Sequence, residues 1–260
     1  MRGATTIHGL AATLALVLWP AGAASGQVQP LAARVESARD GWVRLSFAAR
    51  PGVCGDGHSL SFNRRGDDEL WESECEHGPV RVALAVRDGR VTDVEAHVGG
   101  RWRTDVPGVT DLGTVSAVGA ASYLMDLASR LEGKASREAI LPAVLADSVE
   151  VWPELIRLAR DDSRPRETRK SAVFWLGQAA GSKVAEELGS IATDTSVDRD
   201  VRAAAIFALS QRPNDEGVPA LIRIARRHPD PELRRKALFW LAQSGDERAI
   251  ALFEEILTKH

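Results

Sequence analysis

The sequence predicts an all-α right-handed solenoid of helical hairpins over residues 113–260, preceded by a small antiparallel β domain over residues 28–108. Two observations support this division. Three segments in the C-terminal half align with one another without gaps, at a period that suits one pair of helices. Residues 28–108 instead place apolar side chains at alternate positions, which is typical of half-buried strands.

The aligned segments are residues 167–178, 200–211 and 232–243. Their shared arginine recurs as Arg169, Arg202 and Arg234, 33 and then 32 residues apart. A fourth, weaker copy spans residues 136–145, where Ala139 precedes Ala172 by 33 residues. A repeat of this size predicts one helix-turn-helix unit for each copy.

Further helices are predicted beside these segments, over residues 152–159, 184–192, 218–225 and 249–257. Apolar residues recur in them at positions i, i+3 and i+4, as in Leu155, Leu158 and Ala159. Each helix therefore has one apolar stripe and needs a neighbour to cover it. Stacked pairs of such helices bury a continuous core that no single pair makes.

Acidic residues with proline or serine mark the turns between helices, as in residues 161–165 and 228–231. Together with the repeated segments, this pattern resembles HEAT repeats, in particular the short bacterial variety also called phycobilisome-lyase-like, over about residues 113–260. The resemblance implies an α-solenoid and says little about function. Two enzyme families have HEAT-like folds, the phycobilin lyases and a di-iron hydroxylase with repeated His-Glu pairs, but this sequence has no His-Glu dipeptide.

Three strands are predicted in the N-terminal part, over residues 43–47, 80–86 and 92–98. The last two flank Arg-Asp-Gly and form a hairpin. We expect a three-residue loop with Gly89 in the left-handed conformation, which pairs Val82 with Val94 and Val80 with Ala96. This register keeps the apolar side chains of both strands on one face of the sheet.

The chain has two cysteines, Cys54 and Cys75, both in the predicted β domain. We predict a disulfide between them, which closes a loop of about 20 residues and stabilises the fold by about 3 kcal/mol in the chain-entropy model. The alternative is a metal site, because Cys54, His58, Cys75 and His77 together offer four sulfur and nitrogen ligands of the kind that zinc takes.

Residues 1–26 are predicted to be a secretory signal peptide. Arg2 supplies the positive charge, residues 10–18 form a short apolar run, and small residues follow Pro20. We therefore expect a periplasmic or secreted protein, in which a disulfide is favoured. No later stretch is apolar enough to cross a membrane. The formal net charge of −3 argues against a general nucleic-acid binder, which needs a basic face.

The phenylalanine in each aligned segment is the candidate for partner binding. At 100° per residue, Phe174 lies opposite the apolar stripe that contains Ala172 and Leu176. We expect a row of phenylalanines and glutamines along the groove of the solenoid, with Phe207 substantially exposed. The alternative is that the rings are buried between repeats. The candidate binding residues are Phe174, Gln178, Phe207, Gln211, Phe239 and Gln243.

Motifs for catalysis are absent from the sequence: there is no Gly-x-Ser-x-Gly, no His-Glu-x-x-His and no phosphate-binding loop. We therefore predict a non-enzymatic exported scaffold that needs no cofactor and binds a protein or peptide in the solenoid groove, with the β domain as a cap or second recognition module. The alternative is a metal-dependent enzyme or accessory lyase with a site in the β domain, using Asp56, His58 or His77. We interpret the repeated arginines as scaffold residues that pair with turn carboxylates such as Asp162, Asp198 or Asp230.

Overall fold

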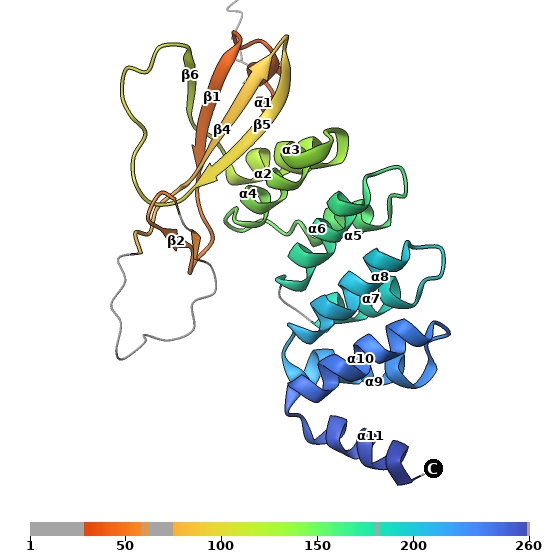
Figure 1. Cartoon of the computed structure of the whole chain (residues 1–260). Helices are drawn as coiled ribbons and strands as arrows, with labels where there is room; N and C mark the ends of the chain where they lie inside the picture. Colours follow the sequence, from red (N-terminus) through yellow and green to blue (C-terminus); the bar gives the residue numbers. More distant parts are fainter. Residues whose placement is uncertain (1–28, 59, 62–74, 180–181, 259–260) are drawn as a thin grey trace, which may run out of the picture.

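The computed structural model describes residues 29–58, 60–61, 75–179 and 182–258 (Figure 1). The predicted signal peptide lies outside these residues. The strands are β1 (Gly41–Phe47), β2 (Cys54–Gly55), β3 (Leu60–Ser61), β4 (Val80–Arg87), β5 (Arg90–His97) and β6 (Val109–Thr114). The helices are α1 (Leu31–Glu36), α2 (Ala117–Arg130), α3 (Gly133–Glu138), α4 (Ile140–Val144), α5 (Trp152–Arg160), α6 (Arg166–Gly177), α7 (Ser182–Thr193), α8 (Arg199–Ser210), α9 (Asn214–Arg227), α10 (Pro231–Ser244) and α11 (Glu247–Thr258).

The main sheet has four strands in the order β5-β4-β1-β6. The three strands predicted from alternation, β1, β4 and β5, pair with one another in antiparallel fashion, but β6 runs parallel to β1. The prediction of a purely antiparallel sheet is therefore wrong, and the main sheet continues past residue 108. Strand β6 was missed because only part of its sequence alternates and its side chains are partly or fully exposed.

The β4–β5 hairpin differs from the predicted register by two residues. Val82 pairs with Ala96 and Leu84 pairs with Val94. Two features cause this difference. Asp88 and Gly89 have φ values of 49° and 68° and form a two-residue loop instead of the predicted three-residue loop, which shifts the register by one residue. An irregularity between Ala85 and Val86 shifts it by one more. A shift of two residues keeps each side chain on its face, so the apolar residues still share the buried face.

One hydrophobic core connects the sheet to the first helices. Val43, Leu45 and Phe47 of β1 are buried in the same cluster as the inner residues of α2. The segment after α4 is also bonded to the end of β1: Asp147 donates its N–H to the Ala48 carbonyl at 2.9 Å. The sheet therefore packs directly on the start of the helical stack, as Figure 1 shows.

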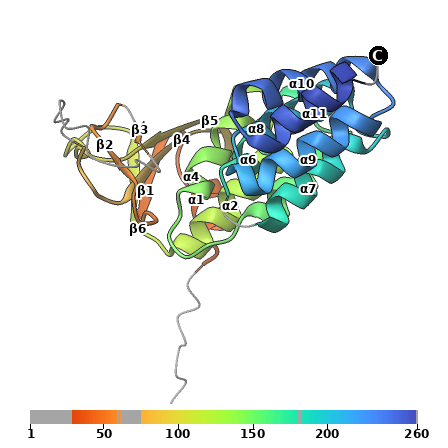
Figure 2. The same ribbon diagram turned by 90° about the horizontal axis from the view of Figure 1, so that it is seen from below.

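From α5 onward the helices form pairs, α5 with α6, α7 with α8, and α9 with α10. Helices α6, α8 and α10 stack in one layer, and α7 and α9 lie in the other (Figure 2). The alanine shared by the repeats, at 172, 205 and 237, is fully buried in each. Gly177 lies so close to α8 that a Cβ there meets the Ala208 Cβ at 2.9 Å, which shows how tightly these helices approach.

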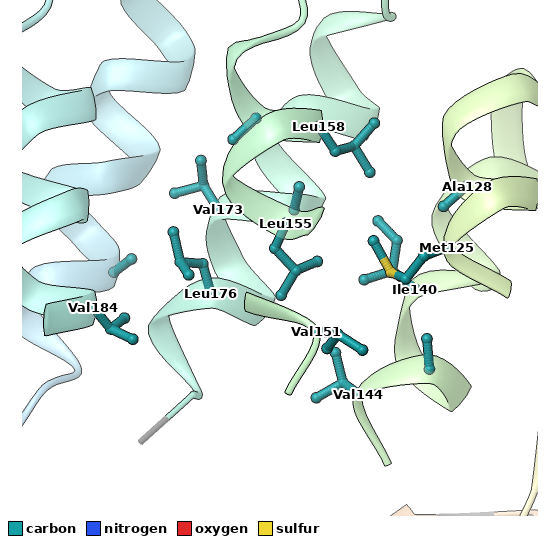
Figure 3. Packing of buried hydrophobic residues seen from close by; sticks show 14 of the residues in the cluster. Met125, Ala128, Ile140, Val144, Val151, Leu155, Leu158, Val173, Leu176 and Val184 are labelled. Atoms are coloured by element: carbon teal, nitrogen blue, oxygen red, sulfur yellow. The ribbon is translucent and has the colours of Figure 1, made fainter. Parts of the chain in front are cut away.

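The predicted helices are present, and their apolar stripes form the core between the layers. Leu155 of α5 and Leu176 of α6 are fully buried between successive pairs, as Figure 3 shows. The weak fourth copy differs, because residues 136–145 are divided between α3 and α4. Pro142 explains this break: a proline ring clashes with the carbonyl four residues earlier, and α3 ends there, at Glu138.

Candidate interaction surface

The three repeated phenylalanines lie on the layer formed by α6, α8 and α10. Phe174 is 40% exposed and Phe239 is 56% exposed. Phe207, which we expected to be substantially exposed, is partly buried because its ring lies against Trp240, with centroids 5.1 Å apart. The rings at the two ends of the row are thus accessible, and the middle ring is partly covered by the next repeat.

Two tryptophans complete this surface. Trp175 packs edge-on against Phe174 with centroids 5.0 Å apart, and Trp240 packs edge-on against Phe239 at 4.9 Å. Sequence reasoning missed them, although the dipeptide Phe-Trp occurs at the same position in two of the repeats. We call Phe174, Trp175, Phe207, Phe239 and Trp240 the aromatic stripe.

The repeated glutamines follow the phenylalanines by one helical turn. Gln178 and Gln211 are the C-terminal caps of α6 and α8, and Gln243 lies in the last turn of α10. Gln211 and Gln243 are exposed, and Gln178 is partly buried. Amide side chains thus border the aromatic stripe at the C-terminal ends of its helices, where they present both donors and acceptors.

A hollow of about 190 Å³ lies at the α6 end of the aromatic stripe, and Trp152, Trp175, Leu155 and Arg50 are among its lining residues. Burial lowers the pKa of the Arg50 guanidinium. The Lys183 ammonium lies 5.2 Å from the centroid of the Trp152 ring, within the range of a cation–π contact. The stripe therefore ends in a concave site lined by two indole rings, the basic Arg50 and the acidic Glu150.

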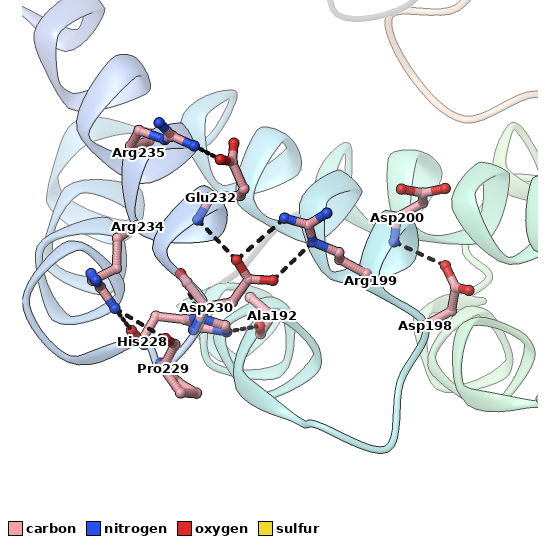
Figure 4. A network of polar contacts seen from close by, with 10 residues as sticks. All are labelled: Ala192, Asp198, Arg199, Asp200, His228, Pro229, Asp230, Glu232, Arg234 and Arg235. Carbon is pink, nitrogen blue, oxygen red and sulfur yellow. Dashed lines mark hydrogen bonds and ion pairs between the residues drawn. The ribbon is translucent and has the colours of Figure 1, made fainter.

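Ion pairs join the turns of successive repeats. Arg166 lies 3.3 Å from Asp198, and Arg199 lies 2.8 Å from Asp230. The hydrogen bond from Arg199 lowers the pKa of Asp230. The repeated arginines were predicted to pair with turn carboxylates of this kind. Arg234 instead donates to the backbone carbonyls of His228 and Pro229, in the turn before α10 (Figure 4).

His228 lies buried in the same network (Figure 4). Its Nδ1 accepts the N–H of Asp230 at 3.0 Å, so its Nε2 carries the proton and donates to the Ala192 carbonyl at 3.1 Å. The imidazole thus connects the end of α7 to the turn before α10. This arrangement is that of a structural histidine, since both ring nitrogens are bonded to backbone groups.

The predicted disulfide between Cys54 and Cys75 is confirmed, with the two Cα atoms 5.3 Å apart. Both sulfur atoms are bonded to each other, so neither is a thiolate ligand of the alternative zinc site. His77 places Nδ1 2.9 Å from the Val53 carbonyl, and His58 is exposed. Within the part of the chain that the structure describes, no group of three or more His, Cys, Asp or Glu side chains is arranged to hold a metal ion.

Comparison with known proteins gives a match for the C-terminal part of the helical stack. Residues 188–260 match the family model of HEAT repeats. These residues form a HEAT-repeat domain. The match spans α8 to α11 and the second half of α7, and therefore includes Phe207 and Phe239. No curated protein and no solved structure matches the chain. Among the described residues, no helix is both long enough and apolar enough to span a membrane.

Proposed function

We propose that this protein is a non-enzymatic interaction scaffold that binds a protein or peptide segment along the aromatic stripe. The observation that supports this function is the pair of accessible rings, Phe174 and Phe239, on one layer of a helical stack whose C-terminal part matches HEAT repeats. Stacked helical repeats offer extended surfaces that suit elongated partners. Aromatic side chains are enriched among the residues that carry most of the binding energy.

The packing of these rings favours binding. Phe174 and Phe239 each lie edge-on against the tryptophan that follows them, which restricts their side-chain rotation before a partner arrives. A ring that is already ordered loses little conformational entropy on binding, so more of the apolar contact energy appears as affinity. The bordering glutamines Gln178, Gln211 and Gln243 supply hydrogen bonds to a partner backbone.

We also propose that the protein is exported to the periplasm or secreted, and that its repeats are of the bacterial phycobilisome-lyase-like variety. The disulfide between Cys54 and Cys75 supports export, because disulfides persist mainly in oxidising compartments. The predicted signal peptide at residues 1–26 agrees with this proposal. Fractionation of cells that express the full chain tests it: recovery of the protein in the cytoplasm with two titratable thiols contradicts export.

The binding proposal is tested by capturing partners from the periplasmic or secreted fraction with the immobilised full chain. The test variant carries Phe174→Ala and Phe239→Ala, and the matched control carries Leu257→Ala, which removes another exposed apolar side chain. We expect the wild type and the control to retain the same partner and the double variant to lose it, with all three melting at similar temperatures. Equal capture by the double variant contradicts a role of the aromatic stripe.

A further inference from the structure

A second concave surface lies between α2 and α5, next to the hollow at the α6 end of the aromatic stripe. It is a groove of about 520 Å³, within the size range of sites for small molecules. The N-terminal helices of the stack and the loop over residues 145–151 form its walls. Its inner surface is apolar and is made by Ala121, Met125, Val151 and Leu158, all of which are buried. Methionine adapts its shape to different apolar groups.

Acidic side chains surround this apolar surface. Asp126 from α2, Glu150 from the loop, Glu154 from α5 and Asp161 from the following turn line the groove, together with a single basic residue, Arg157. The lining residues therefore carry four carboxylates and one guanidinium. A cation is favoured in such a setting over an anion, because opposite charges attract and like charges repel.

The carboxylates differ in whether a nearby arginine already balances their negative charge. Three of them lie near an arginine: Asp126 accepts from Arg130 at 2.7 Å, and Glu154 accepts from Arg157 at 2.6 Å. Asp161 lies 3.7 Å from the Arg164 guanidinium. Glu150 accepts a hydrogen bond from a neutral donor, the indole N–H of Trp152 at 3.3 Å. Glu150 is also exposed, so its carboxylate is accessible to a ligand from solvent. It is the carboxylate best placed to bind a cationic group.

One backbone and one side-chain hydrogen bond hold the groove in shape. The loop that carries Glu150 is anchored to the sheet, since Arg50 donates its N–H to the Leu145 carbonyl at 2.8 Å. At the other end, Arg164 donates to the carbonyl of Ser129 at 2.7 Å and so connects α2 to the turn after α5. A site whose walls are fixed before binding loses little free energy in ordering them.

We infer that this groove is a binding site for a small organic cation with an apolar body, of the class of aliphatic amines. The apolar part lies on Met125, Val151 and Leu158, and the ammonium group lies at the acidic rim near Glu150. The groove contains no ring of the aromatic stripe, although it shares Val149, Glu150 and Val151 with the hollow at the α6 end of the stripe.

The inference is tested by calorimetric titration of the full chain with n-octylammonium and, separately, with n-octanoate, which has a similar apolar chain but the opposite charge. We expect binding of n-octylammonium that weakens with added salt, and no detectable binding of n-octanoate. Glu150→Gln is expected to weaken binding about tenfold, the value of one hydrogen bond to a charged group. The matched control is Glu186→Gln, an exposed carboxylate on α7, which leaves the affinity unchanged.

Ser122→Phe provides a second variant, because Ser122 is an exposed residue of the groove and a phenyl ring there fills the space without altering the core. We expect it to abolish n-octylammonium binding while the helical circular-dichroism signal stays at the wild-type level. Three results overturn the inference: no detectable binding of n-octylammonium, equal affinity for n-octanoate, or equal loss of affinity in Glu150→Gln and Glu186→Gln. Glu150→Gln remains decisive if Ser122→Phe does not fold, since it changes only an exposed side chain.

Discussion

Phe207 of α8 lies against Trp240 of α10, with ring centroids 5.1 Å apart and ring planes inclined by 53°. This contact joins one repeat to the next, whereas Phe174 and Phe239 contact the tryptophan beside them on their own helix. The middle ring of the aromatic stripe therefore contributes to the stacking of the repeats. The outer rings are more available to a partner.

Replacement of each phenylalanine by alanine is therefore expected to lower the free energy of unfolding by a different amount. Phe207→Ala is expected to lower it by about 2 kcal/mol, less than for a fully buried phenylalanine because the ring is only partly covered. Phe174→Ala and Phe239→Ala are each expected to lower it by less than about 1 kcal/mol. Urea denaturation measures all three, and an equal loss in the three variants contradicts this division of roles.

Two glycines at contacts between helices are expected to respond oppositely to substitution by alanine. A Cβ at Gly177 meets the Ala208 Cβ at 2.9 Å, so Gly177→Ala is expected to separate the helices and destabilise the fold by about 1 to 3 kcal/mol. A Cβ at Gly189 lies 3.9 Å from the Ala220 Cβ, an ordinary contact. Gly189→Ala is therefore expected to stabilise α7 by up to about 1 kcal/mol. Thermal melts distinguish the two, and destabilisation of both variants shows that helix spacing is not the cause.

The helical part was predictable because its signals are local and repeated. Residues four apart lie on one helix face, so Leu155 and Ala159 identify the buried side of α5 without knowledge of its neighbours. Trp240 is different, because its contact with Phe207 depends on how α10 is placed on α8. A helical wheel treats one helix at a time and therefore does not show that Phe207 is partly covered.

The sheet and the groove depend on contacts between distant residues. Strand β6 pairs with β1 across more than 60 residues, and its side chains carry little apolar signal of their own. The groove between α2 and α5 requires the bond from Arg50 to Leu145, which no local pattern indicates. The hairpin register was off by two residues for two reasons. Asp88 as well as Gly89 adopts positive φ, which is uncommon for a residue other than glycine and shortens the loop by one residue. The pairing also shifts by one residue between Ala85 and Val86, which alternation alone does not indicate.

Removal of the disulfide is expected to act locally. Cys54 lies in β2, where Gly55 and Glu76 exchange two backbone hydrogen bonds, and the main sheet has its own buried core. In a variant with Cys54→Ser and Cys75→Ser, we expect the helical circular-dichroism signal to be almost unchanged. Hydrogen exchange at the amides of Gly55 and Glu76 is expected to accelerate, because the loop of about 20 residues is no longer closed. Loss of the helical signal together with the exchange protection of these amides contradicts a local role of the disulfide.

Acid is expected to destabilise the C-terminal end of the helical stack through Asp246, which lies between α10 and α11. The side-chain hydrogen bond from Arg248 lowers the pKa of Asp246 to about 2, below the ordinary value of 3.8. Because the folded pKa lies below the unfolded one, this carboxylate stabilises the folded state fully above about pH 4, and the contribution is lost as the pH falls toward about 2.

Urea denaturation at several pH values in this range should show a smaller loss of stability for Asp246→Asn than for the wild type. Arg248→Ala removes the same hydrogen bond and should reduce the pH dependence in a similar way, with no further reduction in the double variant. An unchanged pH dependence in both single variants excludes this ion pair as a source of the acid sensitivity.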